Sequence, residues 1–228
     1  MPLNLAMPHD EGYAYGNWGL VITMVAVSLF FIVRFIPMKT RLGKRSGGAL
    51  IAFLVALFAE MYGFPLTIYL ASHFLGVKIP FDHISGHLLG DLISYLGLGN
   101  GWLIVMVLSN ALILIGIMVI SSGWERVYAS QGELVTNGIY RHMRHPQYTG
   151  IFIVTLGFMI QWPTLATLIL WPFVIWMYVR LARREEQDVL KQHPETYREY
   201  MARTPMFFPN PFRTPAGHHP TATTRGPK

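Results

Sequence analysis

Apolar stretches that recur along the whole chain constrain its fold more than any other feature. They cover residues 18–36, 49–72, 102–120, 150–160 and 165–179. A helix rises 1.5 Å per residue, so about 20 residues cross the roughly 30 Å hydrocarbon core of a bilayer. The composition agrees, because 52% of the residues are hydrophobic and only 13% are charged, which is too apolar for an ordinary soluble domain. We expect an all-α membrane protein with five transmembrane helices.

The last two apolar runs are separated only by a short break at residues 161–164. Pro146 has a fixed φ angle and no N–H to lose, so it favours the first turn of a helix, and we expect the fourth helix to begin there. From Pro146 to the break, about 16 residues would span roughly 24 Å, less than the hydrocarbon core. This pattern predicts a tight C-terminal helical hairpin. The polar periodic segment 183–203, interrupted by Pro194, predicts a cytoplasmic C-terminal helix.

Basic residues beside the apolar runs predict the orientation. They gather in the loop after the first run and at the end of the fifth, as Lys39, Arg41, Lys44 and Arg45, and then Arg180, Arg183 and Arg184. By the positive-inside rule both places are cytoplasmic, which puts residues 1–17 outside as an exterior tail and would mean the inner membrane in a bacterium. Because these charges set the topology, the net charge of +6 does not predict nucleic-acid binding. The absence of cysteine excludes disulfides, thiolate metal sites and a cysteine nucleophile.

The segment 73–101 between the second and third runs is expected to be an exterior amphipathic insertion. His83, His87 and Asp91 follow one another at intervals of four residues, so they would share one side of a helix. Two histidines one turn apart with a carboxylate could bind zinc or a similar ion. We favour the alternative of an interfacial helix with its polar side in water, since several glycines weaken this helix.

One ionisable residue, Glu60, falls near the middle of the second run, where Gly63 and Pro65 predict a kink. An ionisable residue at that depth is a candidate functional group. The alternative is a protonated carboxyl group that is hydrogen-bonded to a neighbouring helix, because burial disfavours the charged form. Asn110, midway along the third run, is the natural partner.

A basic and aromatic stretch, Leu-Val-Thr-Asn-Gly-Ile-Tyr-Arg-His-Met-Arg-His-Pro-Gln-Tyr-Thr-Gly at residues 134–150, lies directly before the hairpin. The unpaired N–H groups near Gln147 and Tyr148 carry the positive end of the helix dipole, and four basic side chains precede them at positions 141, 142, 144 and 145. This arrangement favours an anionic group. An acidic pair, Glu185 and Glu186, follows the fifth run, and a hairpin would bring it near the basic stretch. A ligand that carries both a carboxylate and cationic centres fits the two groups.

This stretch contains the motif Leu-Val-Thr-x-Gly-x-Tyr-x-x-x-Arg-His-Pro-x-Tyr-x-Gly. It is followed by an apolar hairpin and then by Arg-x-x-Arg-Arg-Glu-Glu at residues 180–186. In this order the motifs resemble those of integral-membrane methyltransferases of the isoprenylcysteine carboxyl methyltransferase and phospholipid N-methyltransferase type. The resemblance covers about 85 residues and implies that 122–208 is a methyltransferase core. The apolar pattern places three spans with the exterior insertion in 18–121, and a composition rich in Pro, Thr and Gly predicts that 209–228 is a disordered tail. It implies S-adenosyl-L-methionine as the cofactor. The residues that it assigns to the cofactor are Leu134, Val135, Gly138, Tyr140, His145, Pro146, Tyr148, Gly150, Glu185 and Glu186, and those that it assigns to catalysis are Arg144 and Glu186.

The acceptor of the methyl group stays open at this point. The resemblance favours an isoprenylcysteine-type carboxylate, with an ethanolamine lipid or a small thiol as alternatives. A carboxylate needs no base, whereas an amine or a thiol must lose a proton, for which His142, Tyr140 or Glu60 are candidate relays. We expect a hydrophobic acceptor to enter sideways from the bilayer, between the third span and the hairpin.

Two other classes of protein share some of these features. A membrane sterol-type reductase has a similar C-terminal architecture, but its phosphate-rich NADPH would prefer basic residues where this chain has the acidic pair. A small transporter or a non-catalytic assembly factor is the alternative from outside the enzymes. Five spans without a matched pair of broken helices argue against a transporter.

Overall fold

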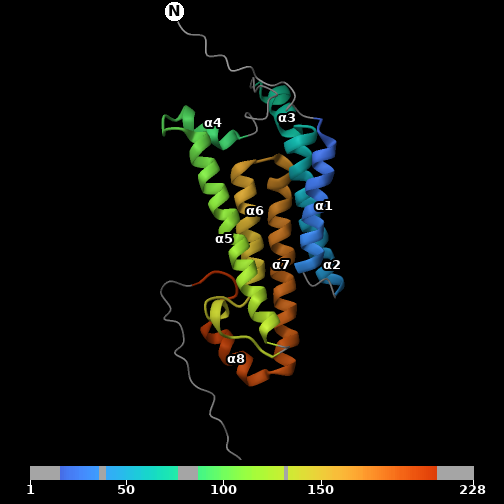
Figure 1. Cartoon of the computed structure of the whole chain (residues 1–228), viewed down its shortest axis with the longest axis vertical. Helices are drawn as coiled ribbons and strands as arrows, with labels where there is room; N and C mark the ends of the chain where they lie inside the picture. The colour runs from blue at the N-terminus through green and yellow to red at the C-terminus, as the bar shows by residue number, and fades with distance from the viewer. Residues whose placement is uncertain (1–15, 36–39, 77–86, 131–132, 210–228) are drawn as a thin grey trace, which may run out of the picture.

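The computed structural model of the protein describes residues 16–35, 40–76, 87–130 and 133–209, and the described residues form helices and loops without a strand (Figure 1). The helices are α1 (Trp18–Phe35), α2 (Arg41–Phe58), the π-helical η2 (Ala59–Gly63), α3 (Leu66–Leu75), α4 (Leu88–Tyr95), α5 (Gly101–Ala129), the 3₁₀ turn η4 (Gly138–Arg141), α6 (Pro146–Gln161), α7 (Leu165–Gln192) and α8 (Pro194–Arg203). The all-α fold is therefore confirmed. The expected exterior tail before residue 16, His83 and the expected disordered tail from residue 210 lie outside the described residues.

Local sequence signals set the ends of the hairpin helices. Pro146 and Pro194 are the first residues of α6 and α8, which confirms the predicted start of the hairpin and the predicted break after it. Thr164 precedes α7, and its hydroxyl accepts the backbone N–H of Thr167 at 3.0 Å while the Thr167 hydroxyl accepts the N–H of Thr164 at 3.2 Å. This reciprocal capping box lets α7 begin with only three residues between it and the end of α6.

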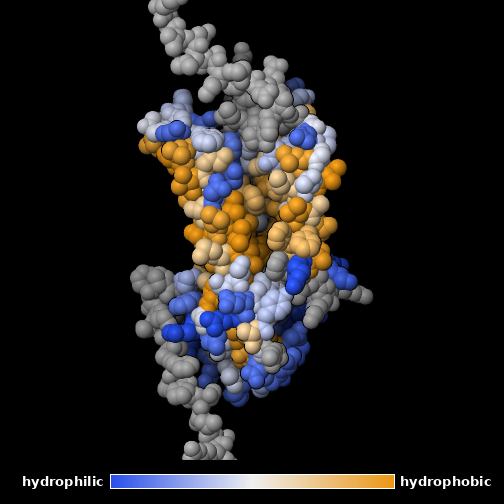
Figure 2. All heavy atoms as spheres, viewed as in Figure 1, coloured by the Kyte–Doolittle hydropathy of each residue, from blue (hydrophilic) through white to orange (hydrophobic). Residues whose placement is uncertain are grey.

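The apolar band of the molecule is built mainly from three long helices. Within the described residues, Leu42–Gly63, Gly101–Ala129 and Leu165–Gln192 are long and apolar enough to cross a membrane, and Trp18–Arg34 is a shorter apolar helix. Figure 2 shows the band as an orange belt between two bluer ends. The chain is thus a helical membrane protein, and the count of five spans stays a prediction. We call the two ends of the bundle the α4 end and the α8 end.

The second and third apolar runs have other bounds than predicted. The second helix starts at Arg41 and its span ends at Gly63, because Pro65 cannot donate a backbone N–H and the chain breaks into the separate helix α3 where a kink was expected. The third helix continues to Ala129, nine residues beyond the predicted end of the span. Polar residues such as Glu125 and Arg126 extend α5 past the apolar band.

The predicted pairing of Glu60 with Asn110 is wrong. Glu60 is buried in the π-helical turn, and its Oε2 accepts the backbone N–H of Thr67 at 2.9 Å. Asn110 is exposed on α5, and its amide donates to the carbonyl of Met106 at 2.8 Å within the same helix. The short side chain of Asn110 thus bonds to the backbone of its own helix, as is common for asparagine.

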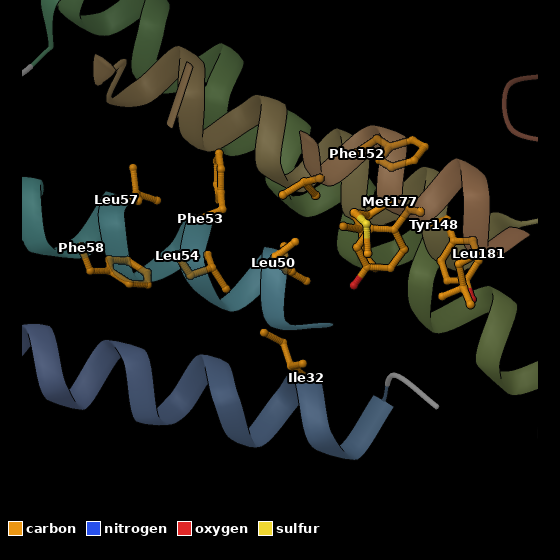
Figure 3. Packing of buried hydrophobic residues seen from close by; sticks show 14 of the residues in the cluster. Ile32, Leu50, Phe53, Leu54, Leu57, Phe58, Tyr148, Phe152, Met177 and Leu181 are labelled. Atoms are coloured by element: carbon orange, nitrogen blue, oxygen red, sulfur yellow. The ribbon is translucent and has the colours of Figure 1, made fainter. Parts of the chain in front are cut away.

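The spanning helices lie in a curved row. α5 packs on α6, α6 lies beside α7, α7 packs on α2, and α2 packs on α1 (Figure 1). One buried core cluster joins the helices of this row, and it includes Phe53, Leu54 and Leu57 of α2, Phe152 of α6 and Met177 of α7 (Figure 3). The row leaves α1 and α5 as its two free ends, and this determines where a ligand can enter.

Small residues allow α5 and α6 to approach closely. A Cβ on Gly150 would lie 2.5 Å from Ile120 and 2.6 Å from the carbonyl oxygen of Gly116. Gly116 and Gly157 meet the facing helix in the same way, with nearest distances of 2.6 and 2.8 Å. Backbones packed this closely stabilise helix pairs in membranes. They also narrow the space between α5 and α6, where the sequence predicted the entry of an acceptor, and that route stays a prediction.

We expect Gly150→Val to destabilise the protein, because the added methyl groups would push α5 and α6 apart. Overpacking of this kind costs about 1–3 kcal/mol. The measurement is the free energy of unfolding of the detergent-solubilised protein. Gly48→Ala on α2 is the matched control, since its Cβ meets nothing within 4 Å and alanine favours a helix. Equal stability of the two variants would contradict close packing of α5 on α6.

The described part of the predicted insertion, residues 73–76 and 87–101, contains the end of α3, the helix α4 and the loop before α5. α4 starts at Leu88, so His87 precedes it and does not share a helical face with Asp91. His87 is buried, its Nδ1 lies 2.7 Å from the carbonyl oxygen of Gln161, and its ring packs edge-on against Trp162. The described residues contain no cluster that could hold a metal ion. His87 therefore fastens α4 to the bend of the hairpin.

The burial of His87 makes stability depend on pH. Burial lowers the pKa of His87, although the Gln161 carbonyl and Asp91 oppose the shift. The unfolded chain therefore takes up the proton more readily, and stability falls as the pH drops below the usual histidine pKa of about 6.5. We expect the midpoint of thermal unfolding to decrease between pH 7 and pH 5, and His87→Gln to reduce this dependence. An unchanged pH profile in the variant would contradict the role of His87.

Candidate functional site

A single cavity of about 940 Å³ joins the α8 end of the bundle to its apolar interior. Its polar end contains Arg144, His145, Tyr148, Glu185, Glu186 and Tyr200. Its apolar end lies between the free ends of the helix row, with Phe31 and Ile32 from α1 and Ile113 and Ile117 from α5. Ligand sites commonly measure 300–1,000 Å³, so this volume can hold a cofactor and part of an acceptor together.

The hairpin brings the basic stretch and the acidic pair together at the polar end. The Tyr148 hydroxyl donates to Oε1 of Glu185 at 2.7 Å. Nε2 of His145 lies 3.1 Å from Oε1 of Glu186, and Nδ1 of His145 lies 3.8 Å from Oε2 of Glu185. The rings of His145 and Tyr148 stack with centroids 5.5 Å apart. Glu186 is buried, whereas the side chain of Glu185 keeps 40% of its exposure and can meet a ligand in the cavity.

Arg144 forms a buried ion pair with Glu186. Its Nε donates to Oε1 of Glu186 at 2.7 Å, and its Nη1 donates to the carbonyl oxygens of Met201, at 3.2 Å, and of Thr204. The side chains of Arg144 and Glu186 are 9% and 5% exposed, so each depends on the other for its charge balance. In this arrangement the guanidinium group connects α6, α7 and the segment after α8.

The segment after α8 returns to the start of α6. We call residues 204–208 the strap. The backbone N–H groups of Arg144 and His145 donate to the carbonyls of Pro205 and Met206 at 2.9 and 3.0 Å. The Thr149 hydroxyl donates to the carbonyl of Phe207 at 2.9 Å. These bonds give hydrogen-bond acceptors to the backbone N–H groups before the helix. The N–H groups of Gln147 and the following residue lie in the first turn of α6, where no carbonyl of the helix can accept them.

Phenol groups line the polar end from η4 and α8. The Gln147 amide donates to the Tyr140 hydroxyl at 2.6 Å, and the Tyr200 hydroxyl donates to the Tyr140 carbonyl at 2.6 Å. Burial raises the pKa of Tyr140 to about 12, and it raises the pKa of Tyr197 and Tyr200 well above the usual tyrosine value. These hydroxyls therefore stay protonated near neutral pH and act as hydrogen-bond donors.

The structure divides the residues predicted for the site into two groups. Seven of the ten residues predicted to bind the cofactor line the cavity: Leu134, Val135, Tyr140, His145, Tyr148, Glu185 and Glu186. Arg144, which was predicted to be catalytic, lines it as well. The other three pack against α5: a Cβ on Gly138 would meet Arg126, Pro146 lies against Gly123, and Gly150 lies against Gly116. Gly138 also has a φ of +60°, which favours glycine. Their contacts position the helix start.

The sequence reading missed residues that only the tertiary structure brings to the cavity. Gln147, His193, Tyr197 and Tyr200 belong to its polar end. The shared helical face of Tyr197 and Tyr200 was the only available signal. His142, one candidate proton relay, is exposed and Glu60 lies on η2; neither lines the cavity.

Comparisons with known proteins place the chain in a family. The model of the phospholipid methyltransferase family matches residues 87–196. A nickel-cobalt-cadmium resistance protein of Alcaligenes xylosoxydans xylosoxydans is 30% identical over 156 residues, which are 64% of this chain and 68% of the relative. The chain belongs to the phospholipid methyltransferase family.

Named enzymes are also among the relatives. A methanethiol S-methyltransferase of Crocosphaera subtropica is 32% identical over 142 residues, or 60% of this chain and 53% of the relative. A protein-S-isoprenylcysteine O-methyltransferase of Schizosaccharomyces pombe is 31% identical over 77 residues, a third of each chain. The chain thus spans about half or less of these two relatives. Their names support an enzyme that transfers methyl groups.

Proposed function

We propose that the protein is a membrane methyltransferase that uses S-adenosyl-L-methionine and acts on a hydrophobic acceptor dissolved in the bilayer. The observation that carries the proposal is the single cavity with a charged end at Glu185 and His145 and an apolar end between α1 and α5. A water-soluble cofactor and an apolar acceptor need these two environments side by side. The orientation with the α8 end in the cytoplasm, where the cofactor is made available, is part of the proposal.

The residues at the polar end fit the chemistry of this cofactor. S-adenosylmethionine supplies a methyl carbon on a positively charged sulfur, and an acceptor lone pair can bond to that carbon while the carbon–sulfur bond breaks and its electrons stay on sulfur. The half-exposed carboxylate of Glu185 suits a cationic centre. The free N–H groups at the start of α6 suit the carboxylate. The neutral phenol oxygen of Tyr200, whose hydrogen is donated to the Tyr140 carbonyl, can accept a hydrogen bond from a further polar group.

The apolar end supports the choice of acceptor. Its lining of aliphatic and phenyl side chains excludes water from an acceptor group, which strengthens a carboxylate as a nucleophile. A carboxylate also needs no base. We therefore propose an apolar molecule that carries a carboxylate, as in isoprenylcysteine. A thiol is the second candidate, favoured by the similarity to a methanethiol S-methyltransferase over 60% of the chain.

The test has two stages on the detergent-solubilised full chain. First, radiolabelled S-adenosylmethionine and NADPH are offered separately, and we expect saturable binding of the former alone. Binding of NADPH alone would favour the reductase, and binding of neither would favour a transporter or an assembly factor. Second, methyl transfer is measured over prenylcysteine, ethanolamine-lipid and thiol acceptors. Transfer only to small water-soluble thiols would overturn the proposed carboxylate acceptor.

A further inference from the structure

The apolar end of the cavity opens toward the lipid between α1 and α5. Phe31 of α1 and Ile117 of α5 line the cavity, yet they keep 52% and 49% of their exposure. Residues that line a cavity and also face outward mark its mouth. Figure 2 shows the apolar surface hollowed between the side of α5 and the side of α1. The mouth lies within the apolar band, so a molecule that uses it comes from the bilayer.

A polar bridge crosses between α1 and α5 beside this mouth. Nη1 of Arg34 donates to the Tyr128 hydroxyl at 3.1 Å, across 94 positions of sequence. Arg34 is one turn from Phe31, which lines the cavity. Tyr128 packs against Trp124, another lining residue, with ring centroids 5.4 Å apart. The bridge therefore lies at the edge of the mouth nearer the α8 end.

The chemistry of the bridge makes it easy to open. Arg34 and Tyr128 are both exposed, and a hydrogen bond between exposed side chains is weak. The phenol is a neutral partner for the guanidinium group, whereas a carboxylate would form a stronger, two-pronged pair with it. An amphiphile with an anionic head can thus compete with Tyr128 for Arg34.

We propose that Arg34 and Tyr128 form the threshold of the acceptor entrance, and that Arg34 favours acceptors that carry a carboxylate. The second part rests on the proposed function, since it assumes that a membrane acceptor is methylated. In this role Arg34 is a specificity-determining residue that acts on entry, while the groups around Glu185 act on the bound ligand.

The first test measures access without activity. The chain contains no cysteine, so Ile151→Cys or Thr155→Cys would place a single thiol on the cavity wall. An uncharged alkyl maleimide dissolved in nanodiscs probes the membrane route, and a charged water-soluble thiosulfonate probes the polar end. We expect Arg34→Gln and Tyr128→Phe each to raise the maleimide rate about two- to fivefold, the range for loss of an exposed bridge, with the thiosulfonate rate unchanged.

Arg180→Gln is the matched control, since Arg180 is an exposed arginine on α7 that lies over the Trp176 ring and does not line the cavity. We expect no change in either rate. Unchanged maleimide rates in both bridge variants at both cysteine positions would overturn the threshold. An equal rise for both reagents would also overturn it, because it would mean general loosening of the bundle.

The second test addresses selectivity. Arg34→Gln is expected to raise KM for a carboxylate acceptor severalfold with little change in kcat, and to leave KM for a long-chain thiol unchanged. An unchanged KM for the carboxylate would overturn the selectivity. If the wild type binds no S-adenosylmethionine, the proposed function fails, and the labelling result still decides whether the threshold exists.

Discussion

Replacing Arg144 with alanine is expected to produce the largest loss of stability among single substitutions at the site, about 3–5 kcal/mol. The change leaves the carboxylate of Glu186 buried without its strongest partner and removes two hydrogen bonds to the carbonyls of Met201 and Thr204. An isolated buried charge pays the cost of desolvation without compensation. Arg144 thus supports the site through the position of α7 and the strap.

The measurement is chemical denaturation in detergent micelles. Arg184→Ala is the control, because Arg184 is an exposed arginine at the same end of the bundle and should change stability by no more than about 0.5 kcal/mol. A double variant with Glu186→Ala should lose less than the sum of the single variants, since the second change removes the unpaired charge. If Arg144→Ala is as stable as the wild type and binds S-adenosylmethionine but transfers no methyl group, the arginine acts on the acceptor instead.

Glu185→Gln is expected to weaken the binding of S-adenosylmethionine by about 10- to 100-fold, the range for loss of one hydrogen bond to a charged group. The glutamine keeps the size of the side chain and can still accept from the Tyr148 hydroxyl. Because Glu185 keeps 40% of its exposure, the free energy of unfolding should change little. The experiment separates a ligand contact from a structural contact.

Binding is measured with radiolabelled cofactor on the solubilised protein. Asp188→Asn is the matched control, because Asp188 lies three residues further along α7 and its carboxylate pairs with Lys191 at 2.9 Å on the exposed surface. It should bind the cofactor as the wild type does. Equal affinity of Glu185→Gln and the wild type would show that this carboxylate lies outside the cofactor site.

The features that the sequence predicted are those with a local signal. A proline without an N–H marks the start of α6, and a four-residue break between apolar runs marks the hairpin. Once the hairpin forms, its antiparallel geometry brings residues 145 and 148 near residues 185 and 186, so the juxtaposition of basic and acidic groups follows from chain order alone.

Other features depend on contacts that leave no pattern in the sequence. The strap binds through backbone carbonyls, which every residue possesses, so nothing in residues 204–208 reveals its partner. The mouth of the cavity lies between α1 and α5 because these helices are the two ends of the row. Apolar residues give the same sequence pattern whether they face lipid, core or cavity. The glycines of α5 and α6 were visible, but their facing contacts needed the register of the two helices.

The strap also has a consequence for the order in which the protein is made. Arg144 reaches Thr204, a residue translated 60 positions later, after both hairpin helices and α8. The polar end of the cavity is therefore complete only once the strap has been translated. A chain that stops before residue 204 would lack the strap carbonyls that bind Arg144 and His145, so we expect it to leave the polar end of the cavity unfinished.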